Sequence, residues 1–127
     1  MTSGGPVILI ASRSLFDRLL IERELGKAGW SVRAVRDSLA AERVCSNGRA
    51  SILVIDSGLL EAPHDPQWRE LRSRHPELAA VVCCPTSRTH VQRTDRNTLV
   101  VHPSNRAGIC DAIALLDSYR LEEMSTG

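Results

Sequence analysis

The sequence predicts an α/β domain in which helices cover both faces of a doubly wound, five-stranded parallel sheet. Four short apolar runs are typical of strands buried on both faces, and a fifth run alternates polar and apolar residues as a half-covered edge strand does. Segments of helical character separate the runs. A chain of 127 residues without a linker or a repeat is enough for a single domain, and we expect its core over about residues 6–121.

The five expected strands are Val7–Ala11, Ser31–Val35, Ser51–Asp56, Leu78–Cys84 and Thr98–His102. The third is the central one, and it ends in a carboxylate, Asp56. Open parallel sheets keep their functional crevice at the carboxyl ends of the strands, which makes Asp56 a candidate site residue. The alternative is that Asp56 only caps the strand and begins a turn.

The first helix is expected from about Leu15 to Ala28, after a cap at Ser12 or Ser14. Gly29 follows it in the position where glycine commonly ends a helix. Its apolar residues cover more than one stripe, so we expect neighbours on two sides of this helix.

The later helices are marked by caps and by helical spacing. Asp37 caps a second helix over about residues 38–45, and Asp65-Pro66 begins a third that ends before His75-Pro76. The last helix follows Pro103-Ser104 and has apolar residues at i, i+3, i+4 and i+7, namely Ile109, Ala112, Ile113 and Leu116. Residues 85–97 have room for two or three helical turns at most, and residues 122–127 are expected to be a tail.

Composition excludes several classes of function. The net charge of +1, with acids interleaved among the bases, disfavours direct binding to nucleic acid or to a membrane surface. No apolar run is long enough to span a bilayer, and no signal peptide is recognised. The four cysteines form no disulfide or zinc pattern, which agrees with a cytoplasmic location and predicts no structural metal.

The order of these features resembles the receiver domain of two-component response regulators. The resemblance is carried by the apolar run at 7–11, the run ending in Asp56, the Arg-Ser-Arg-His-Pro-Glu-Leu segment at 72–78, and His102-Pro103. It covers nearly the whole chain and implies the flavodoxin-like, CheY-like fold with strand order 2-1-3-4-5. Because the connection before the fifth strand is short, the fourth helix of that family is expected to be shortened or lost.

The resemblance implies a phosphoacceptor at Asp56, because receiver domains take a phosphoryl group from a histidine kinase at the matching aspartate. The acid pair that binds Mg²⁺ in that family is replaced here by Ala11 and Ser12, followed by Arg13. Mg²⁺ prefers oxygen ligands with one or two carboxylates, so we expect no cofactor and doubt Mg²⁺ binding. Arg13 is expected to place its guanidinium against Asp56, although it can also be read as a solvated loop residue.

Two further site positions need comment: one differs from the family's residue, and the other has two possible matches in this chain. His102 stands where the family has a lysine, and it carries a positive charge only when protonated. The Thr or Ser that ends the fourth strand of the family matches either Cys84 or Thr86, and the sequence leaves both alternatives open.

Three functions from different classes are weighed. The first is a divergent, pseudo-receiver-like domain that acts in signal transduction as a protein-interaction module without Mg²⁺-dependent phosphorylation. The second is a working phosphoacceptor of a two-component phosphorelay with an unusual site, or the detached receiver of a DNA-binding regulator. The third, a small enzyme or cofactor binder, is disfavoured because residues 11–14 contain no glycine with which to cradle a phosphate, so no enzyme activity is expected.

The expected partner is a protein, either a signalling protein or a histidine kinase, and the sequence leaves a homodimer open. The segment between the fourth and fifth strands carries Arg88, Arg93 and Arg96 with only Asp95 to balance them. These arginines are candidates for binding an acidic partner surface, and the alternative is a solvated loop.

Overall fold

The computed structural model describes residues 7–47, 50–63, 65–85, 92–95 and 97–126, with side chains described throughout except in 92–95 and 120–126. Within these residues one sheet has the strand order β2-β1-β3-β4-β6-β5. Its strands are β1 (Val7–Ala11), β2 (Ser31–Val35), β3 (Ala50–Asp56), β4 (Ala79–Cys83), β5 (Gln92–Asp95) and β6 (Thr98–Val101). All neighbours pair in parallel except β5 and β6, so the expected five-stranded parallel sheet of order 2-1-3-4-5 is confirmed, with β6 as its fifth strand.

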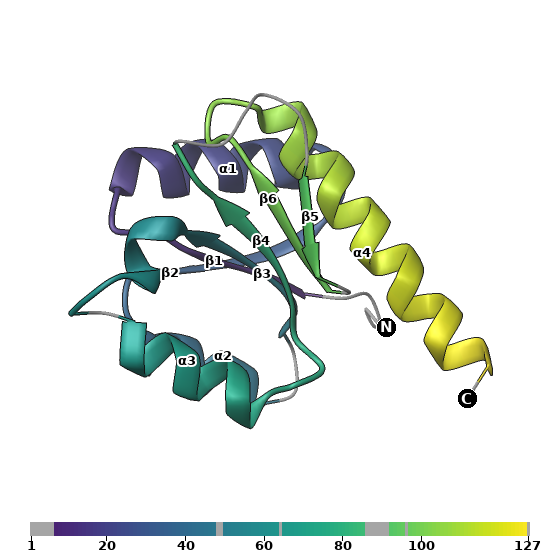
Figure 1. Cartoon of the computed structure of the whole chain (residues 1–127). Helices are drawn as coiled ribbons and strands as arrows, with labels where there is room; N and C mark the ends of the chain where they lie inside the picture. The colour runs from purple at the N-terminus through teal and green to yellow at the C-terminus, as the bar shows by residue number, and fades with distance from the viewer. Residues whose placement is uncertain (1–6, 48–49, 64, 86–91, 96, 127) are drawn as a thin grey trace.

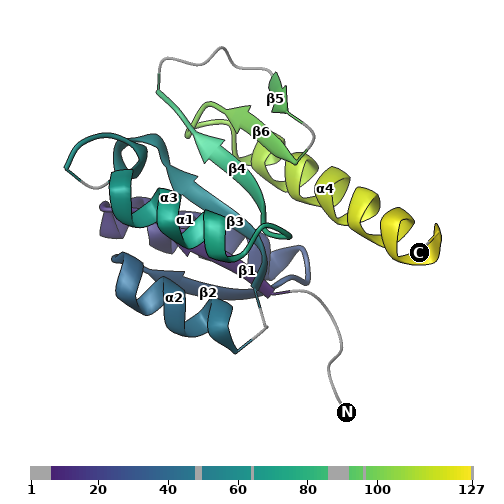
Figure 2. The same ribbon diagram turned by 60° about the horizontal axis from the view of Figure 1, so that its bottom comes forward.

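Helices cover both faces of this sheet. They are α1 (Leu15–Lys27), α2 (Ser38–Ser46), α3 (Asp65–Arg74) and α4 (Arg106–Thr126), and a short 3₁₀ turn, η1 (Ser57–Leu60), follows β3. One face carries α1 and α4, and the other carries α2 and α3 (Figures 1 and 2). None of the described helices has the length and apolarity needed to cross a membrane.

The core consists of two layers, because successive residues of a strand point to opposite faces of the sheet. Ile8 and Ile10 of β1 pack toward α1 and α4, whereas Leu9 and Ala11 pack toward α2 and α3. All four are fully buried, as expected for a strand covered on both sides. Trp68 of α3 is the largest side chain of the second layer and is 2% exposed.

Helix α1 differs from the sequence prediction on its outer side. Ile21 and Leu25 are its buried residues, whereas Leu15, Phe16 and Leu19 are 60%, 69% and 56% exposed. Helix α1 does have the expected neighbours on two sides, the sheet and α4, but these three residues of its apolar set face solvent. Leu15, Phe16 and Leu19, called here the α1 apolar patch, remain open to solvent next to the loop that carries Arg13.

The described part of the segment between β4 and β6 confirms the expected shortening or loss of the family's fourth helix, but it contains a strand that was not predicted. This part forms no helical turn, and Gln92–Asp95 instead runs antiparallel to β6 as an edge strand. A polar, weakly periodic segment offers a helix no apolar stripe with which to pack on the sheet, whereas an edge strand needs mainly main-chain hydrogen bonds. The family's fourth helix is thus replaced by β5 within the described residues.

Residues 122–127 were predicted as a tail, but the backbone of residues 122–126 is helical, so this prediction is wrong. Helix α4 continues to Thr126, because no glycine or proline interrupts the chain between Gly108 and Gly127. The four residues predicted for its inner face, Ile109, Ala112, Ile113 and Leu116, are all 2% exposed or less. Asn105 caps the helix, since its Oδ1 accepts a hydrogen bond from the backbone N–H of Gly108 at 3.0 Å.

Candidate functional site

The strand register brings the residues after β1 and the last residue of β3 together. Ala11 lies beside Ile55 in the β1–β3 pair, and Asp56 lies beside Cys83 in the β3–β4 pair. Asp56 therefore stands at the carboxyl end of the sheet, one step from the loop that begins with Ser12. This is the edge at which open α/β sheets hold their sites.

Asp56 and Arg13 form the ion pair expected from the sequence. Arg13 Nε donates to Asp56 Oδ2 at 3.2 Å, and the two side chains are 56% and 22% exposed. The other carboxylate oxygen, Oδ1, accepts a hydrogen bond from the backbone N–H of Gly58 at 3.0 Å. Both oxygens of Asp56 are thus occupied by donors of the same chain.

Gly58 makes this arrangement possible, and the sequence analysis did not recognise its role. A Cβ atom at Gly58 would overlap Nη2 and Cζ of Arg13, far inside van der Waals contact. The guanidinium lies against the backbone of η1, in space that any other residue would fill. The signal was present in the sequence, because Ser57-Gly58 directly follows Asp56.

Ser12 is part of the scaffold of this loop. It is 3% exposed, and its Oγ accepts a hydrogen bond from the backbone N–H of Ser14 at 3.1 Å. Its carbonyl oxygen accepts from Nη1 of Arg18, and Ser14 caps α1 by accepting from the N–H of Asp17 at 3.2 Å. These bonds fix the loop and leave Arg13 as its exposed side chain. Arg18 is a second residue that the sequence analysis missed.

His102 follows β6 and is engaged in the turn that leads to α4. Its Nδ1 lies 3.1 Å from the backbone N and 2.8 Å from the Oγ of Ser104, and its carbonyl accepts from the N–H of Asn105 at 2.9 Å. Within the described residues, no hydrogen bond or ion pair joins His102 to Asp56. The geometry supports the role of a hydrogen-bonded imidazole at a strand end.

The remaining sequence candidates are placed only in part. The backbone N–H of Cys84 donates to Val101 O at 2.9 Å, which ties the end of β4 to β6. Thr86 lies outside the described residues, so the choice between Cys84 and Thr86 stays open. Among the candidate interaction arginines, Arg88 and Arg96 lie outside as well, and Arg93 is described only through the backbone of β5.

Cys83 is the thiol nearest to Asp56 in the strand register, and its chemistry is set by burial. The side chain is 5% exposed. Burial, followed by the negative charges of Asp56 and Asp17, raises the pKa of Cys83 to about 12. A thiol that stays protonated is a poor nucleophile and a poor metal ligand, so Cys83 acts as a small apolar core residue.

The donor set at this end of the sheet does not fit Mg²⁺. Ala11 offers no ligand atom, Ser12 Oγ is committed to Ser14, and Asp56 is the single carboxylate among these residues, already paired with Arg13. A guanidinium beside the carboxylate also opposes a second cation there. In the described part of the chain, no group of three or more His, Cys, Asp or Glu side chains is arranged to hold a metal ion.

A second cluster of charged side chains joins α2 to α3. Glu42 of α2 accepts from His75 Nε2 at 3.0 Å and lies 3.6 Å from Nη1 of Arg74. Ser46 donates to the same carboxylate at 2.8 Å. The hydrogen bonds from His75 and Ser46, with the nearby positive charges, hold the pKa of Glu42 below its ordinary value. This cluster links two helices.

Comparison with known proteins gives matches of structure alone. No protein-family model matches the chain, and no curated protein matches it. It is similar to the N-terminal domain of a response regulator/sensory box/GGDEF 3-domain protein from Carboxydothermus hydrogenoformans, with 21% identity, a TM-score of 0.68, and coverage of 95% of this chain and 99% of that one. It is also similar to a response regulator receiver protein from Sinorhizobium medicae WSM419, with 19% identity, a TM-score of 0.67, and coverage of 89% and 94%.

A third structure, the signal receiver domain of a protein from Vibrio parahaemolyticus, has 12% identity and a TM-score of 0.70, with coverage of 96% of this chain and 98% of that one. Likeness at such low identity is evidence about the fold and leaves the chemistry of the site to its own residues. The sheet order, the helices on both faces and these matches show that the chain has the fold of response-regulator receiver domains.

Proposed function

We propose that the chain is a receiver-like signalling module that works by binding other proteins and does not depend on Mg²⁺-dependent phosphorylation. One observation carries the proposal: Arg13 forms an ion pair with Asp56 at 3.2 Å while Gly58 binds the other carboxylate oxygen. In the receiver domains that the sequence resembles, the matching aspartate takes up a phosphoryl group beside a bound cation. Here a side chain of the chain itself supplies the positive charge.

The physical consequence is a site held in one electrostatic state. A guanidinium is charged at every accessible pH and pairs well with a carboxylate. Phosphoryl transfer needs a cation that neutralises the charge developing on the phosphate oxygens, and the donor set beside Asp56 is poor for Mg²⁺. Arg13 therefore takes the place of a metal ion with a positive charge that is always present. Partners would bind a single conformation that does not change with phosphorylation.

One described surface supports an interaction role. The α1 apolar patch exposes three large apolar side chains on one helix, and grouped exposed apolar residues commonly mark protein contacts. The arginines predicted as interaction residues, Arg88, Arg93 and Arg96, remain a second proposal for binding an acidic protein surface. The thiols of Cys45, Cys83 and Cys110, which form no disulfide, support placing the protein in the reducing cytoplasm.

The second candidate function is a working phosphoacceptor, which one observation favours. Asp56 ends the central strand and is 22% exposed, so a phosphodonor can reach it once Arg13 moves aside. In that case the partner would be a histidine kinase, and the chain could serve a separate DNA-binding output protein. Neither function makes the chain an enzyme with a substrate of its own.

Acetyl phosphate with millimolar Mg²⁺, followed by intact-mass spectrometry, separates the two functions. We expect no stable adduct on the wild-type chain under conditions in which a known receiver domain is phosphorylated in parallel. The Asp56→Asn variant provides the matched background. A near-stoichiometric phosphate adduct on the wild type, absent from Asp56→Asn, would overturn the proposal in favour of the phosphoacceptor.

A further inference from the structure

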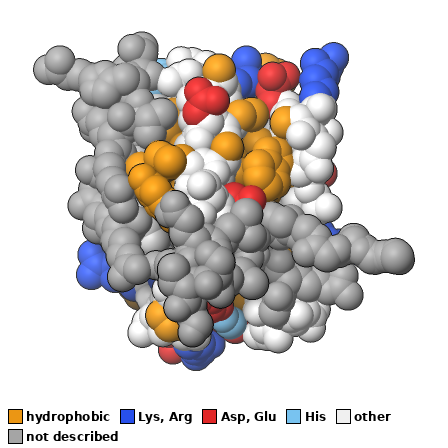
Figure 3. All heavy atoms as spheres, turned by 90° about the vertical axis from the view of Figure 1, so that its right-hand side faces the viewer, with side chains coloured by type: hydrophobic (Ala, Val, Ile, Leu, Met, Phe, Trp, Pro, Cys, Tyr) orange, Lys and Arg blue, Asp and Glu red, His pale blue; other side chains and the backbone are white. Residues whose placement is uncertain are grey.

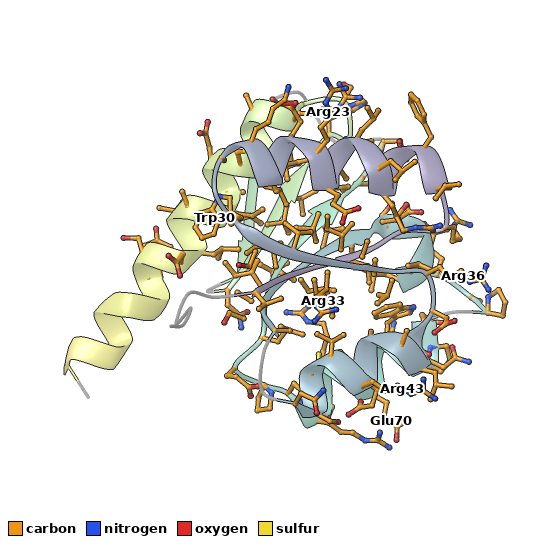
Figure 4. All side chains as sticks on the ribbon, turned by 180° about the vertical axis from the view of Figure 1, so that it is seen from behind. Arg23, Trp30, Arg33, Arg36, Arg43 and Glu70 are labelled. Carbon is orange, nitrogen blue, oxygen red and sulfur yellow. The ribbon has the colours of Figure 1, made fainter. Side chains whose placement is uncertain are left out.

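Three arginines form a basic surface along β2 and α2. Arg33 belongs to β2, Arg36 follows that strand, and Arg43 lies on α2, and all three are exposed. Figure 4 looks onto this side of the molecule, where β2 and α2 lie in front and the three side chains are labelled. We call these three residues the β2–α2 basic surface.

The charges of this surface are not neutralised within the described chain. Among the described residues, no carboxylate lies within ion-pair distance of Arg33, Arg36 or Arg43. The acids nearest in sequence are engaged elsewhere: Asp37 caps α2 through the N–H of Ala40 at 2.8 Å, and Glu42 faces α3. Glu70 of α3, labelled near Arg43 in Figure 4, pairs with Arg74 at 2.8 Å, so the three arginines carry positive charge that no described ion pair satisfies.

The same surface borders an open edge of the sheet. Strand β2 lies at the end of the strand order, and β1 is its only strand neighbour in the described chain. An edge strand leaves alternate N–H and C=O groups free to pair with another chain. Arg33 stands opposite Leu9 in the register, and Leu9 packs toward α2 and α3, so Arg33 projects on the face that carries α2.

We propose that β2 accepts an extended acidic segment of a partner protein as an additional strand, with the carboxylates of that segment on Arg33, Arg36 and Arg43. Strand addition takes its affinity from main-chain hydrogen bonds and its specificity from alternate side chains. Carboxylates at every second position of the segment would all point toward the face of α2. This inference deepens the proposed function by naming a class of partner, and it does not depend on the chemistry of Asp56.

Two observations favour a peptide over other anionic or sheet-forming partners. Leu39 of α2 is 65% exposed between Arg36 and Arg43 in the sequence, and a polyphosphate or nucleic acid backbone has no apolar group to cover it. A second copy of the chain, paired symmetrically through β2, would bring two sets of these arginines together, and like charges across strands repel.

The side of the molecule that lies a quarter turn away from the view of Figure 4 has a different character. In the space-filling view of the right-hand side of Figure 1, hydrophobic and acidic side chains occupy the centre of the visible described surface, and basic ones lie toward its rim (Figure 3). An acidic segment finds complementary charge on the side that carries Arg33, Arg36 and Arg43.

The test uses the whole chain, labelled with ¹⁵N, and a short synthetic peptide that alternates glutamate and threonine. We expect amide shift changes concentrated in β2 and α2, with slowed amide exchange in β2. The double variant Arg33→Ala, Arg36→Ala should bind about ten-fold more weakly, because it removes two charge contacts. The double variant Arg23→Ala, Arg106→Ala loses the same charge from exposed arginines outside this surface and should bind as the wild type does.

A second peptide of equal charge, interrupted by prolines, separates strand addition from attraction by charge. Proline lacks the N–H that a strand donates, so this peptide should bind about ten-fold more weakly than the first. Equal binding of the two peptides, equal losses in the two double variants, or shifts centred outside β2 and α2 would each overturn the inference. Tighter binding of a DNA oligonucleotide would assign the surface to nucleic acid instead. None of these outcomes alters the acetyl phosphate result, so the two proposals fail separately.

Discussion

Asp56 and Glu42 are carboxylates of similar exposure, 22% and 26%, in two clusters of very different construction. Glu42 receives a hydrogen bond from His75 and another from Ser46 and lies near Arg74, and these contacts join α2 to α3. Asp56 receives one arginine, which approaches across a glycine from an exposed loop. The first cluster connects elements of the fold. The second cluster joins only the exposed loop after β1 to the end of β3. Functional residues are commonly held on such loops by a rigid sheet.

The largest effect on stability is expected in the α2–α3 cluster. Replacing Glu42 with Ala leaves His75, whose side chain is 15% exposed, without its main partner. We expect a loss of about 1–2 kcal/mol of unfolding free energy, the usual cost of an unsatisfied and partly buried polar group. Urea denaturation followed by the fluorescence of buried Trp68 measures it. Glu77→Ala is the control, because Glu77 is 71% exposed and lies 3.9 Å from His75. Equal losses in both variants would contradict the prediction.

The same cluster should give stability a dependence on pH. The pKa of Glu42 is lower in the folded chain than its ordinary value of 4.5. The unfolded chain therefore takes up a proton first as pH falls, and the stabilisation by Glu42 is present above that value and disappears as pH passes through the folded pKa. The wild type should exceed Glu42→Gln in stability at neutral pH, and the difference should shrink below pH 4.5. If the stability difference between the wild type and Glu42→Gln grew below that pH, the prediction would be wrong.

A smaller effect is expected for Arg13→Ala. A partly buried pair would cost more to break, because removing the arginine would leave a buried charge without a partner. Here Arg13 is 56% exposed, and Asp56 keeps both solvent access and the N–H of Gly58. We expect less than about 1 kcal/mol, as for other solvent-exposed pairs. Arg23→Ala, on the exposed side of α1, is the reference variant for urea denaturation. A loss of several kcal/mol would indicate that Arg13 supports the fold.

The extent to which sequence predicted structure differs between these regions for physical reasons. The buried runs, Gly29 with its φ of +93°, and the Asp37 cap are local signals, because each residue type fits one backbone requirement. The antiparallel strand β5 was missed because its polar residues carry no pattern of period two, and an edge strand does not need one. The exposure of the α1 apolar patch was missed because an apolar residue type does not guarantee burial. Whether a side chain is buried depends on the elements that pack against it.

The sequence predicted which residues lie at the candidate site, but only part of the contacts among them. Asp56 and Arg13 could be brought together because parallel strands end at one edge of the sheet. The bond from Gly58 and the bond from Arg18 depend on local backbone positions within a few ångströms, which periodicity does not encode. His102 was placed beside the site by resemblance alone, and its nearest partner is Ser104 in the following turn.

The smallest effect on stability, and the sharpest test of the comparison, is expected for Gly58→Ala. Gly58 has a negative φ, so alanine meets no backbone strain, and the three atoms nearest to the new methyl group all belong to the far end of the flexible Arg13 side chain. The arginine should swing into solvent, at a cost of less than about 1 kcal/mol. Because both changes remove the same contact, Arg13→Ala combined with Gly58→Ala should cost no more than either alone, whereas independent sites would add. An additive double variant would mean that Gly58 does not position Arg13. If the stability costs do not add, and the Glu42 cluster is unchanged in the same variants, then Gly58 positions Arg13. The fold would then not depend on the ion pair between Arg13 and Asp56.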